Sequence, residues 1–313
     1  MDCWSLVNGG WVEGEVASAE AWWFNILNTG APEAAHLAEL ASRFGLHPLA
    51  VEDCISPYLH APKIDEFGDN LFVVLQAIVA GDDGPELAEL DAFLAPRYLI
   101  TYAETPIPGL ADVVAALRNG LGVRPGSDGL FHAIADRTVD AVLPQVHAMA
   151  EQLEAIESQA LARPGDARLQ QGILALRSRA GHIRRVFTSE LTVIQRLSRG
   201  EFAEIRDENR IYFRDIYDHL VRIDLALENI REDAEVVLGT YLSAVNNRLS
   251  EVMKVLSIVA ALALPATVIS GVFGTNFDNV PGLHSNWGFA AMMAATVGVM
   301  GGMATYFWRR GWF

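Results

Sequence analysis

The chain has 313 residues, of which 39 are acidic and 23 are Lys or Arg, giving a formal net charge of −16 at pH 7. The acidic excess lies in residues 1–254, which hold 38 of the acids and 21 of the bases. This balance excludes nucleic acid as a partner, because no basic stripe faces phosphates, and it suits cations. The cysteines, Cys3 and Cys54, are far apart without CxxC spacing, which predicts neither a disulfide framework nor a zinc site.

Strand-like and helical segments alternate along the first part of the chain, and Gly- and Pro-containing turns such as 81–85 separate them. The pattern predicts a small α/β domain over residues 1–125. Strands are expected at 22–27, 71–80, 87–94 and 97–102, and helices at 33–44, 48–55 and 106–121.

Long helices are predicted over residues 126–254, with breaks at 163–166 and near 199–200. Residues 202–264 contain no proline and one glycine, so a single helix can run through them. Its apolar positions alternate in spacings of three and four, which is the heptad seam of helices packed side by side. The seam consists of Ile216, Leu220, Ile223, Leu227, Ile230, Ala234, Val237, Tyr241 or Leu242, Val245, Leu249, Val252 and Leu256. This spacing fits both an intramolecular bundle and a homo-oligomer.

Two uncharged stretches, 255–277 and 279–308, predict membrane-spanning helices at 255–274 and 289–308. About 20 apolar residues cross a bilayer core as a helix, and two such runs together make a buried soluble helix a poor alternative. Lys254 precedes the first span and Arg309 and Arg310 follow the second, which predicts cytoplasmic termini. Met1 to Gly10 show no signal peptide. Residues 255–313 are therefore expected to form a transmembrane hairpin with an outer loop at 275–288 and a short basic tail.

A hairpin of two spans cannot enclose an aqueous pore, so transport requires several copies around an axis. Continuing the heptad seam into the first span predicts the side that faces this axis. Its residues are Met253, Leu256, Ala260, Leu264, Thr267 and Gly271. A mostly apolar lining passes an ion with its water shell or gates by dewetting.

Several stretches resemble the CorA-type metal ion transporters, in the order in which that family carries them. They are 47–53 (HPLAVED), 61–65 (APKID), 212–219 (YFRDIYDH), 241–243 (YLS), 247–256 (NRLSEVMKVL), 265–277 (PATVISGVFGTNF) and 308–313 (WRRGWF). The resemblance covers nearly the whole chain from about His47.

The resemblance implies an α+β membrane protein that assembles as a funnel-shaped homopentamer in the bacterial inner membrane. It further implies a channel importing Mg²⁺, Co²⁺ and Ni²⁺, whose outer Gly-Met-Asn filter corresponds to Gly274, Thr275 and Asn276. Carbonyl and amide oxygens there would hold the waters of a hydrated ion, because Mg²⁺ dehydrates reluctantly. Regulatory metal sites between subunits are expected at Asp53 and Asp215, with Glu52 and Asp136 as further candidates. No cofactor is expected beyond these cations.

Two departures from the magnesium pattern leave the ion open. Thr275 replaces the filter methionine, and residues 280–283 read Val-Pro-Gly-Leu where magnesium-type members carry Met-Pro-Glu-Leu. The second feature resembles the zinc-transporting ZntB branch, which gives a proton-coupled Zn²⁺ transporter as the alternative. Asp278 can partly restore an acidic mouth, although a lone loop acid is equally compatible with a solvated side chain. His284 can favour zinc, although a loop histidine without a second ligand is more often merely exposed.

The remaining histidines show no i, i+4 pair with one another and are assigned no metal. A membrane-anchored coiled-coil scaffold that conducts nothing is the second alternative. An enzyme is not expected, because the sequence contains no nucleophile elbow, P-loop or metallohydrolase motif.

Overall fold

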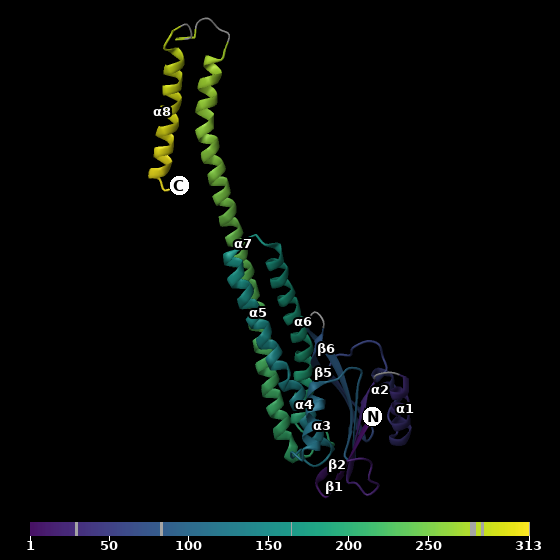
Figure 1. Ribbon diagram of the computed structural model, residues 1–313. Helices are drawn as coiled ribbons and strands as arrows, with labels where there is room; N and C mark the ends of the chain where they lie inside the picture. Colours follow the sequence, from purple (N-terminus) through teal and green to yellow (C-terminus); the bar gives the residue numbers. More distant parts are fainter. Residues whose placement is uncertain (29–30, 82–83, 164, 276–279, 283–284, 313) are drawn as a thin grey trace. The chain divides into compact units, whose positions relative to one another are not determined.

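The computed structural model describes residues 1–28, 31–81, 84–163, 165–275, 280–282 and 285–312, with the side chains of 31–34 left aside. Its residues form two compact units (Figure 1). The sheet unit comprises Met1–Ser158 and Ala167–Leu238, and the hairpin unit comprises Gln159–Asp166 and Gly239–Phe313. Each unit is described by itself below.

A mixed seven-stranded sheet is the centre of the sheet unit, with the order β2-β1-β3-β7-β6-β5-β4. Its strands are β1 (Asp2–Val7), β2 (Gly10–Glu13), β3 (Ala21–Leu27), β4 (Lys63–Phe67), β5 (Asn70–Gly81), β6 (Gly84–Ala95) and β7 (Tyr98–Ala103). Only β3 and β7 pair in parallel, and every other neighbouring pair is antiparallel. The four predicted strands are confirmed as β3, β5, β6 and β7, whereas β1, β2 and β4 were not predicted.

One face of the sheet is covered by α1 (Ala31–Phe44) and α2 (Pro48–Cys54). Leu37 and Leu40 of α1 and Cys54 of α2 join Phe72 and Phe93 of the sheet in a buried cluster. The start of α2 is fixed by its sequence, since Pro48 suits the first turn and His47 Nδ1 accepts a hydrogen bond from the Leu49 amide at 3.3 Å. Both helices are confirmed where the sequence predicted them.

The opposite face is covered by α3 (Pro108–Arg118), α4 (Ser127–Asp140) and α6 (Ala167–Ser198), so that the sheet lies between two helical layers (Figure 1). The Glu190 side chain of α6 reaches β5 of the sheet, where the backbone amide of Gln76 donates a hydrogen bond to Glu190 Oε2 at 3.1 Å. This contact fastens α6 to β5 at a point beyond the end of the β4 pairing.

The long helix α7 (Arg210–Phe273) begins eight residues later than the 202 expected, after a short 3-10 turn (Asp207–Asn209). Its start is held by the buried carboxylate of Asp128, which accepts hydrogen bonds from the Arg206 amide at 3.0 Å and from Asn209 Nδ2 at 2.8 Å. The breaks expected near 163–166 and 199–200 are confirmed, because α5 (Val142–Ala162) ends before the first and α6 before the second.

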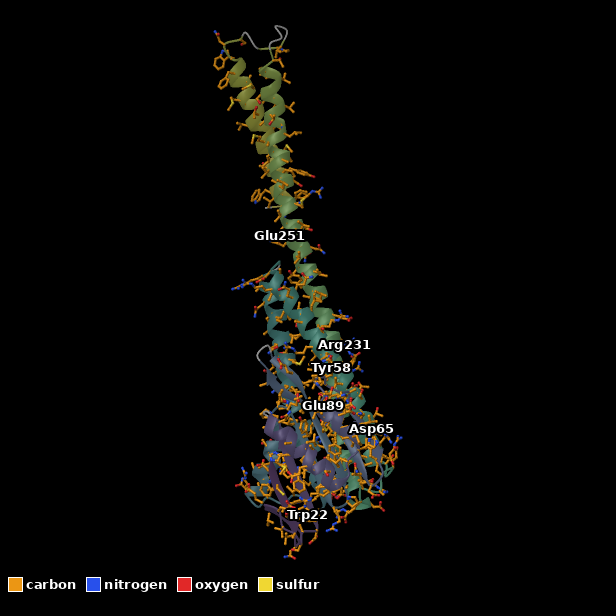
Figure 2. All side chains as sticks on the ribbon, turned by 90° about the vertical axis from the view of Figure 1, so that its right-hand side faces the viewer. Trp22, Tyr58, Asp65, Glu89, Arg231 and Glu251 are labelled. Carbon is orange, nitrogen blue, oxygen red and sulfur yellow. The ribbon has the colours of Figure 1, made fainter. Side chains whose placement is uncertain are left out.

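In the hairpin unit, the end of α7 and α8 (Gly288–Arg309) are long and apolar enough to cross a membrane, and little of either is buried inside the protein. The bounds of these two candidate spans agree with the predicted ones to within one residue at Phe273 and at Gly288. Figure 2 shows side chains projecting freely around Glu251 of α7, which is exposed. A buried soluble helix would instead have its apolar side chains covered.

Candidate ion pathway and metal site

The predicted pore face lies on the part of α7 that its own chain leaves uncovered. All six of its residues, from Met253 to Gly271, are exposed, whereas Ile258 of the same helix is buried. An uncovered apolar face needs lipid or another copy of the chain as a neighbour. Exposure in a single chain does not separate these two, so the assignment of this face to a pore stays a prediction.

At the predicted mouth, the last turn of α7 closes on itself. The Gly274 amide donates to the Ser270 carbonyl at 2.9 Å, and Thr275 Oγ1 donates to the Val272 carbonyl at 2.8 Å. The Thr275 hydroxyl, which replaces the filter methionine, therefore donates its hydrogen bond to the helix end, and its oxygen can still accept a hydrogen bond from an incoming water. Asn276, Asp278 and His284 lie outside the described residues.

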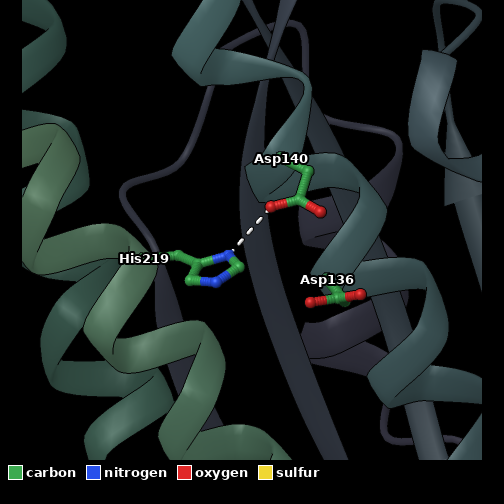
Figure 3. A group of neighbouring side chains, drawn as sticks. All are labelled: Asp136, Asp140 and His219. Carbon is green, nitrogen blue, oxygen red and sulfur yellow. Dashed lines mark hydrogen bonds and ion pairs between the residues drawn. The ribbon is translucent and has the colours of Figure 1, made fainter.

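Three potential metal ligands gather in the sheet unit between α4 and α7. Asp136, Asp140 and His219 each offer one ligand atom, and these atoms lie within 4.8 Å of one another (Figure 3). His219 Nδ1 lies 2.8 Å from Asp140 Oδ1, and His219 Nε2 lies 3.8 Å from Asp215 Oδ2. The exposed Asp215 thus lies at the rim of this group, which we call the α4–α7 cluster.

The electrostatics of the α4–α7 cluster favour a bound cation. Burial raises the pKa of the Asp136 carboxyl, and the charge of Asp140 raises it further, while His219 lowers it. Carboxylates that repel one another are stabilised when a cation bridges them. The imidazole adds a nitrogen ligand, which suits Zn²⁺, Co²⁺ and Ni²⁺ better than Mg²⁺.

Asp53 lies in a different place and is already paired within its own chain. Its carboxylate accepts a hydrogen bond from Lys63 Nζ at 2.6 Å and lies 3.6 Å from His60 Nε2. Lys63 also contacts Asp65 at 2.9 Å. The structure therefore brings Asp136 and Asp215 together but places Asp53, with its neighbour Glu52, apart from them in the single chain. Because the expected sites lie between subunits, they stay predictions.

Sequence reasoning missed Asp140 and His219 as members of the cluster. A signal was present, since Asp136 and Asp140 are four residues apart on one helix, and Asp215 and His219 are four apart on another. Residues at this spacing share a helix face. The spacing of histidines alone does not show these mixed pairs of carboxylate and imidazole. The contact of α4 with α7 is tertiary, and spacing along the sequence does not reveal it.

The chain is similar to known proteins over most of its length. Residues 22–310 match the model of a protein family described as CorA-like Mg²⁺ transporter protein. The cobalt/magnesium transport protein CorA of Thermotoga maritima is 28% identical over 298 residues, covering 93% of this chain and 83% of that protein. The zinc transport protein ZntB of Cronobacter sakazakii is 25% identical over 293 residues, covering 91% and 86%.

A solved structure shows the same fold along the whole chain. The complete structure of the CorA magnesium transporter from Methanocaldococcus jannaschii superposes with a TM-score of 0.88 at 18% sequence identity. The match covers 100% of this chain and 98% of that chain. The expected architecture, with an N-terminal α/β part, a long helix and two candidate C-terminal spans, is thereby confirmed.

Proposed function

Because the chain belongs to the CorA-like Mg²⁺ transporter family, we propose that it imports Mg²⁺, with Co²⁺ and Ni²⁺, through the central pore of a homopentamer. The family assignment supports a divalent cation transporter in a membrane and no enzyme class. The proposed location is the bacterial inner membrane, with both termini in the cytoplasm. The observation that carries the proposal is the family match over residues 22–310 together with the uncovered apolar face of α7.

In this proposal the ion crosses with most of its water shell. Five copies of the loop that begins at Gly274 and Thr275 offer neutral dipoles, which attract a cation without trapping it. The face from Met253 to Gly271 then presents apolar side chains and the single hydroxyl of Thr267, so it offers no ligand that strips water from the ion. The membrane potential supplies the driving force, about 2.3 kcal/mol per charge for each 100 mV.

Regulation is proposed at acidic groups that bind the transported ion on the cytoplasmic side. The α4–α7 cluster supports this, since the ligand atoms of Asp136, Asp140 and His219 lie within 4.8 Å of one another. At Asp53 an incoming cation has to displace the Lys63 ammonium, which holds that carboxylate at 2.6 Å. The α4–α7 cluster is therefore the better placed of the two sites to fill first.

A proton-coupled Zn²⁺ transporter is the second candidate function. It is supported by the Val-Pro-Gly sequence at 280–282 and by the likeness to ZntB. Uptake into proteoliposomes with Mg²⁺, Co²⁺, Ni²⁺ and Zn²⁺, each with and without a pH gradient, separates the two. Mg²⁺ flux that needs no gradient contradicts the zinc candidate, and Zn²⁺ flux that appears only with a gradient contradicts the magnesium candidate. A pure oligomer that passes none of these ions would instead indicate a non-conducting scaffold.

A further inference from the structure

A small cavity lies on the face of the sheet that α1 and α2 cover, beside the C-terminus of α2. It has a volume of about 100 Å³ and is lined by Cys54 of α2 and by Glu89 and Asp91 of β6, with Tyr58 and Tyr102 among its other walls. Glu89 and Asp91 are two residues apart on one strand, so both side chains point to this face. Figure 2 labels Tyr58 and Glu89 at this part of the sheet unit.

The cavity contains a buried carboxyl that lacks a full set of partners. Asp91 is 3% exposed, and its Oδ1 has no hydrogen-bond partner among the residues that the structure describes. Its neighbours across the sheet are Val74 and Tyr102, and neither brings a positive charge. Leaving a buried polar atom without a partner is unfavourable, so Asp91 Oδ1 is available to bind a ligand.

The groups next to Asp91 are a thiol and a second carboxyl, not a base. Cys54, which is also 3% exposed, and Glu89 line the cavity together with Asp91. The cavity therefore contains groups that can bind a cation, and among the described residues the groups next to Asp91 include no positively charged side chain.

Glu89 is held at the cavity from its far side. The His60 amide donates a short hydrogen bond to Glu89 Oε2, and His60 Nδ1 lies 3.1 Å from Glu89 Oε1. Gln76 of β5 also reaches this carboxylate, with its Nε2 3.5 Å from Oε2. These contacts hold the Glu89 carboxyl group at the cavity that Asp91 also lines.

We propose that this cavity binds a transition-metal cation such as Zn²⁺ or Co²⁺, with Cys54 Sγ and Asp91 Oδ1 as ligands and the Glu89 carboxylate as the third. Thiolate together with carboxylate suits these ions, whereas Mg²⁺ takes oxygen ligands and leaves sulfur alone. On binding, the Sγ–H bond breaks, an Sγ–metal bond forms and the proton leaves to solvent. The three ligand atoms do not lie as close together as those of the α4–α7 cluster, so the proposal requires Cys54 and Glu89 to move toward Asp91 when the ion binds.

The site goes beyond the proposed transport function and differs chemically from the α4–α7 cluster. That cluster contains no sulfur, whereas this one has Cys54 as a ligand. Because Mg²⁺ does not fill the Cys54 site, binding there would let the sheet unit respond to zinc or cobalt while Mg²⁺ is present.

Cobalt titration of the detergent-solubilised full chain tests the proposal without any measurement of flux. A Co²⁺ ion bound to thiolate has a sulfur-to-metal charge-transfer band in the near ultraviolet, and Co²⁺ at the α4–α7 cluster has none. We expect this band in the wild type, its loss when Zn²⁺ is added, and no change with excess Mg²⁺. Cys54→Ser is expected to abolish the band, and the matched control Cys3→Ser to keep it.

A second variant preserves the thiol in case Cys54→Ser does not fold. Asp91→Asn keeps the shape of the side chain and is expected to weaken Co²⁺ binding about tenfold or more, as measured by the band. Circular dichroism and oligomer mass verify that each variant is folded. The proposal is overturned if the folded wild type shows no band at saturating Co²⁺, if Cys3→Ser removes the band, or if Asp91→Asn leaves the affinity unchanged. Failure of Mg²⁺ flux would contradict the transport function and leave this titration unaffected.

Discussion

The two halves of α7 carry the same apolar spacing but differ in what covers it. From Ile216 to Val237 the seam is buried, and α6 lies alongside it through ion pairs of Arg184 with Asp224 at 3.0 Å and with Glu228 at 2.8 Å. From Leu242 onward, Leu249, Val252 and Leu256 are exposed. The first half finds its partner within the chain, whereas the second half needs lipid or further copies of the chain.

This contrast settles part of a question that the heptad spacing leaves open. A seam of apolar residues shows that a helix packs against something, but the same spacing serves an intramolecular bundle and a homo-oligomer. The buried half follows the first pattern. The uncovered half continues through the predicted pore face. Substitutions in the buried half are therefore expected to act on stability, and those in the uncovered half on flux.

The largest effect is expected just beyond the uncovered half, at the predicted filter. Asn276→Ala should abolish cation uptake, because its amide is proposed to hold the waters of the incoming ion. The measurement is Mg²⁺ uptake into proteoliposomes, with oligomer mass as the control for assembly. Normal uptake by this variant would mean that the loop after α7 is not the filter.

A matched pair of leucines tests the contrast between the halves directly. Leu227 is 0% exposed and Leu256 is 60% exposed. Leu227→Ala should destabilise the protein by about 2–5 kcal/mol, because it opens a cavity in packed surroundings. Leu256→Ala should change the stability by less than about 0.5 kcal/mol and act on the flux instead. Thermal unfolding followed by circular dichroism checks both, and equal losses in the two variants would contradict the assignment of Leu256 to a pore.

The fold and the spans could be predicted from local pattern, whereas the sites depend on tertiary contacts. The two spans and the breaks between helices follow from charge, proline and glycine, which act on their immediate neighbours. Strand β4, with the sequence KIDEF, was missed because three of its five residues are charged and the adjacent Asp65 and Glu66 interrupt the alternation typical of a strand. The α4–α7 cluster was only half predicted, because His219 meets Asp140 across 79 positions of the chain.

A pH-dependent effect is expected where α6, the partner of the buried half, is fastened to the sheet. Complete burial raises the pKa of Glu190 from its usual 4.5 to about 8, although the Gln76 amide opposes this by donating to the carboxyl. The folded protein therefore holds a proton on Glu190 that the unfolded chain releases above pH 4.5. The contribution of Glu190 to the stability is full below that pH and falls as the pH rises toward 8.

Glu190→Gln should remove this dependence, because an amide does not ionise. The wild type is expected to lose up to about 1.4 kcal/mol for each pH unit in the window, and the variant much less from this position. Melting temperatures of the solubilised chain at pH 5, 6, 7 and about 8 give the comparison. Parallel curves for the two proteins would show that Glu190 is not protonated in the folded state.

The smallest effect is expected at the α4–α7 cluster, where the buried half of α7 carries His219. Asp140→Asn removes the charge that lies 2.8 Å from the imidazole, and it should raise the metal concentration needed to close the channel about tenfold, or about 1.4 kcal/mol. Asp218→Asn is the control, since this exposed acid lies next to His219 on α7 but outside the cluster. The measurement is the flux as a function of metal added on the side of the sheet unit. If both variants shift the closing concentration equally, general acidity of the surface sets the response, and if only Asp140→Asn does, the cation acts through His219 and its neighbours on α4. In that case the covered half of α7 senses the ion that the uncovered half conducts.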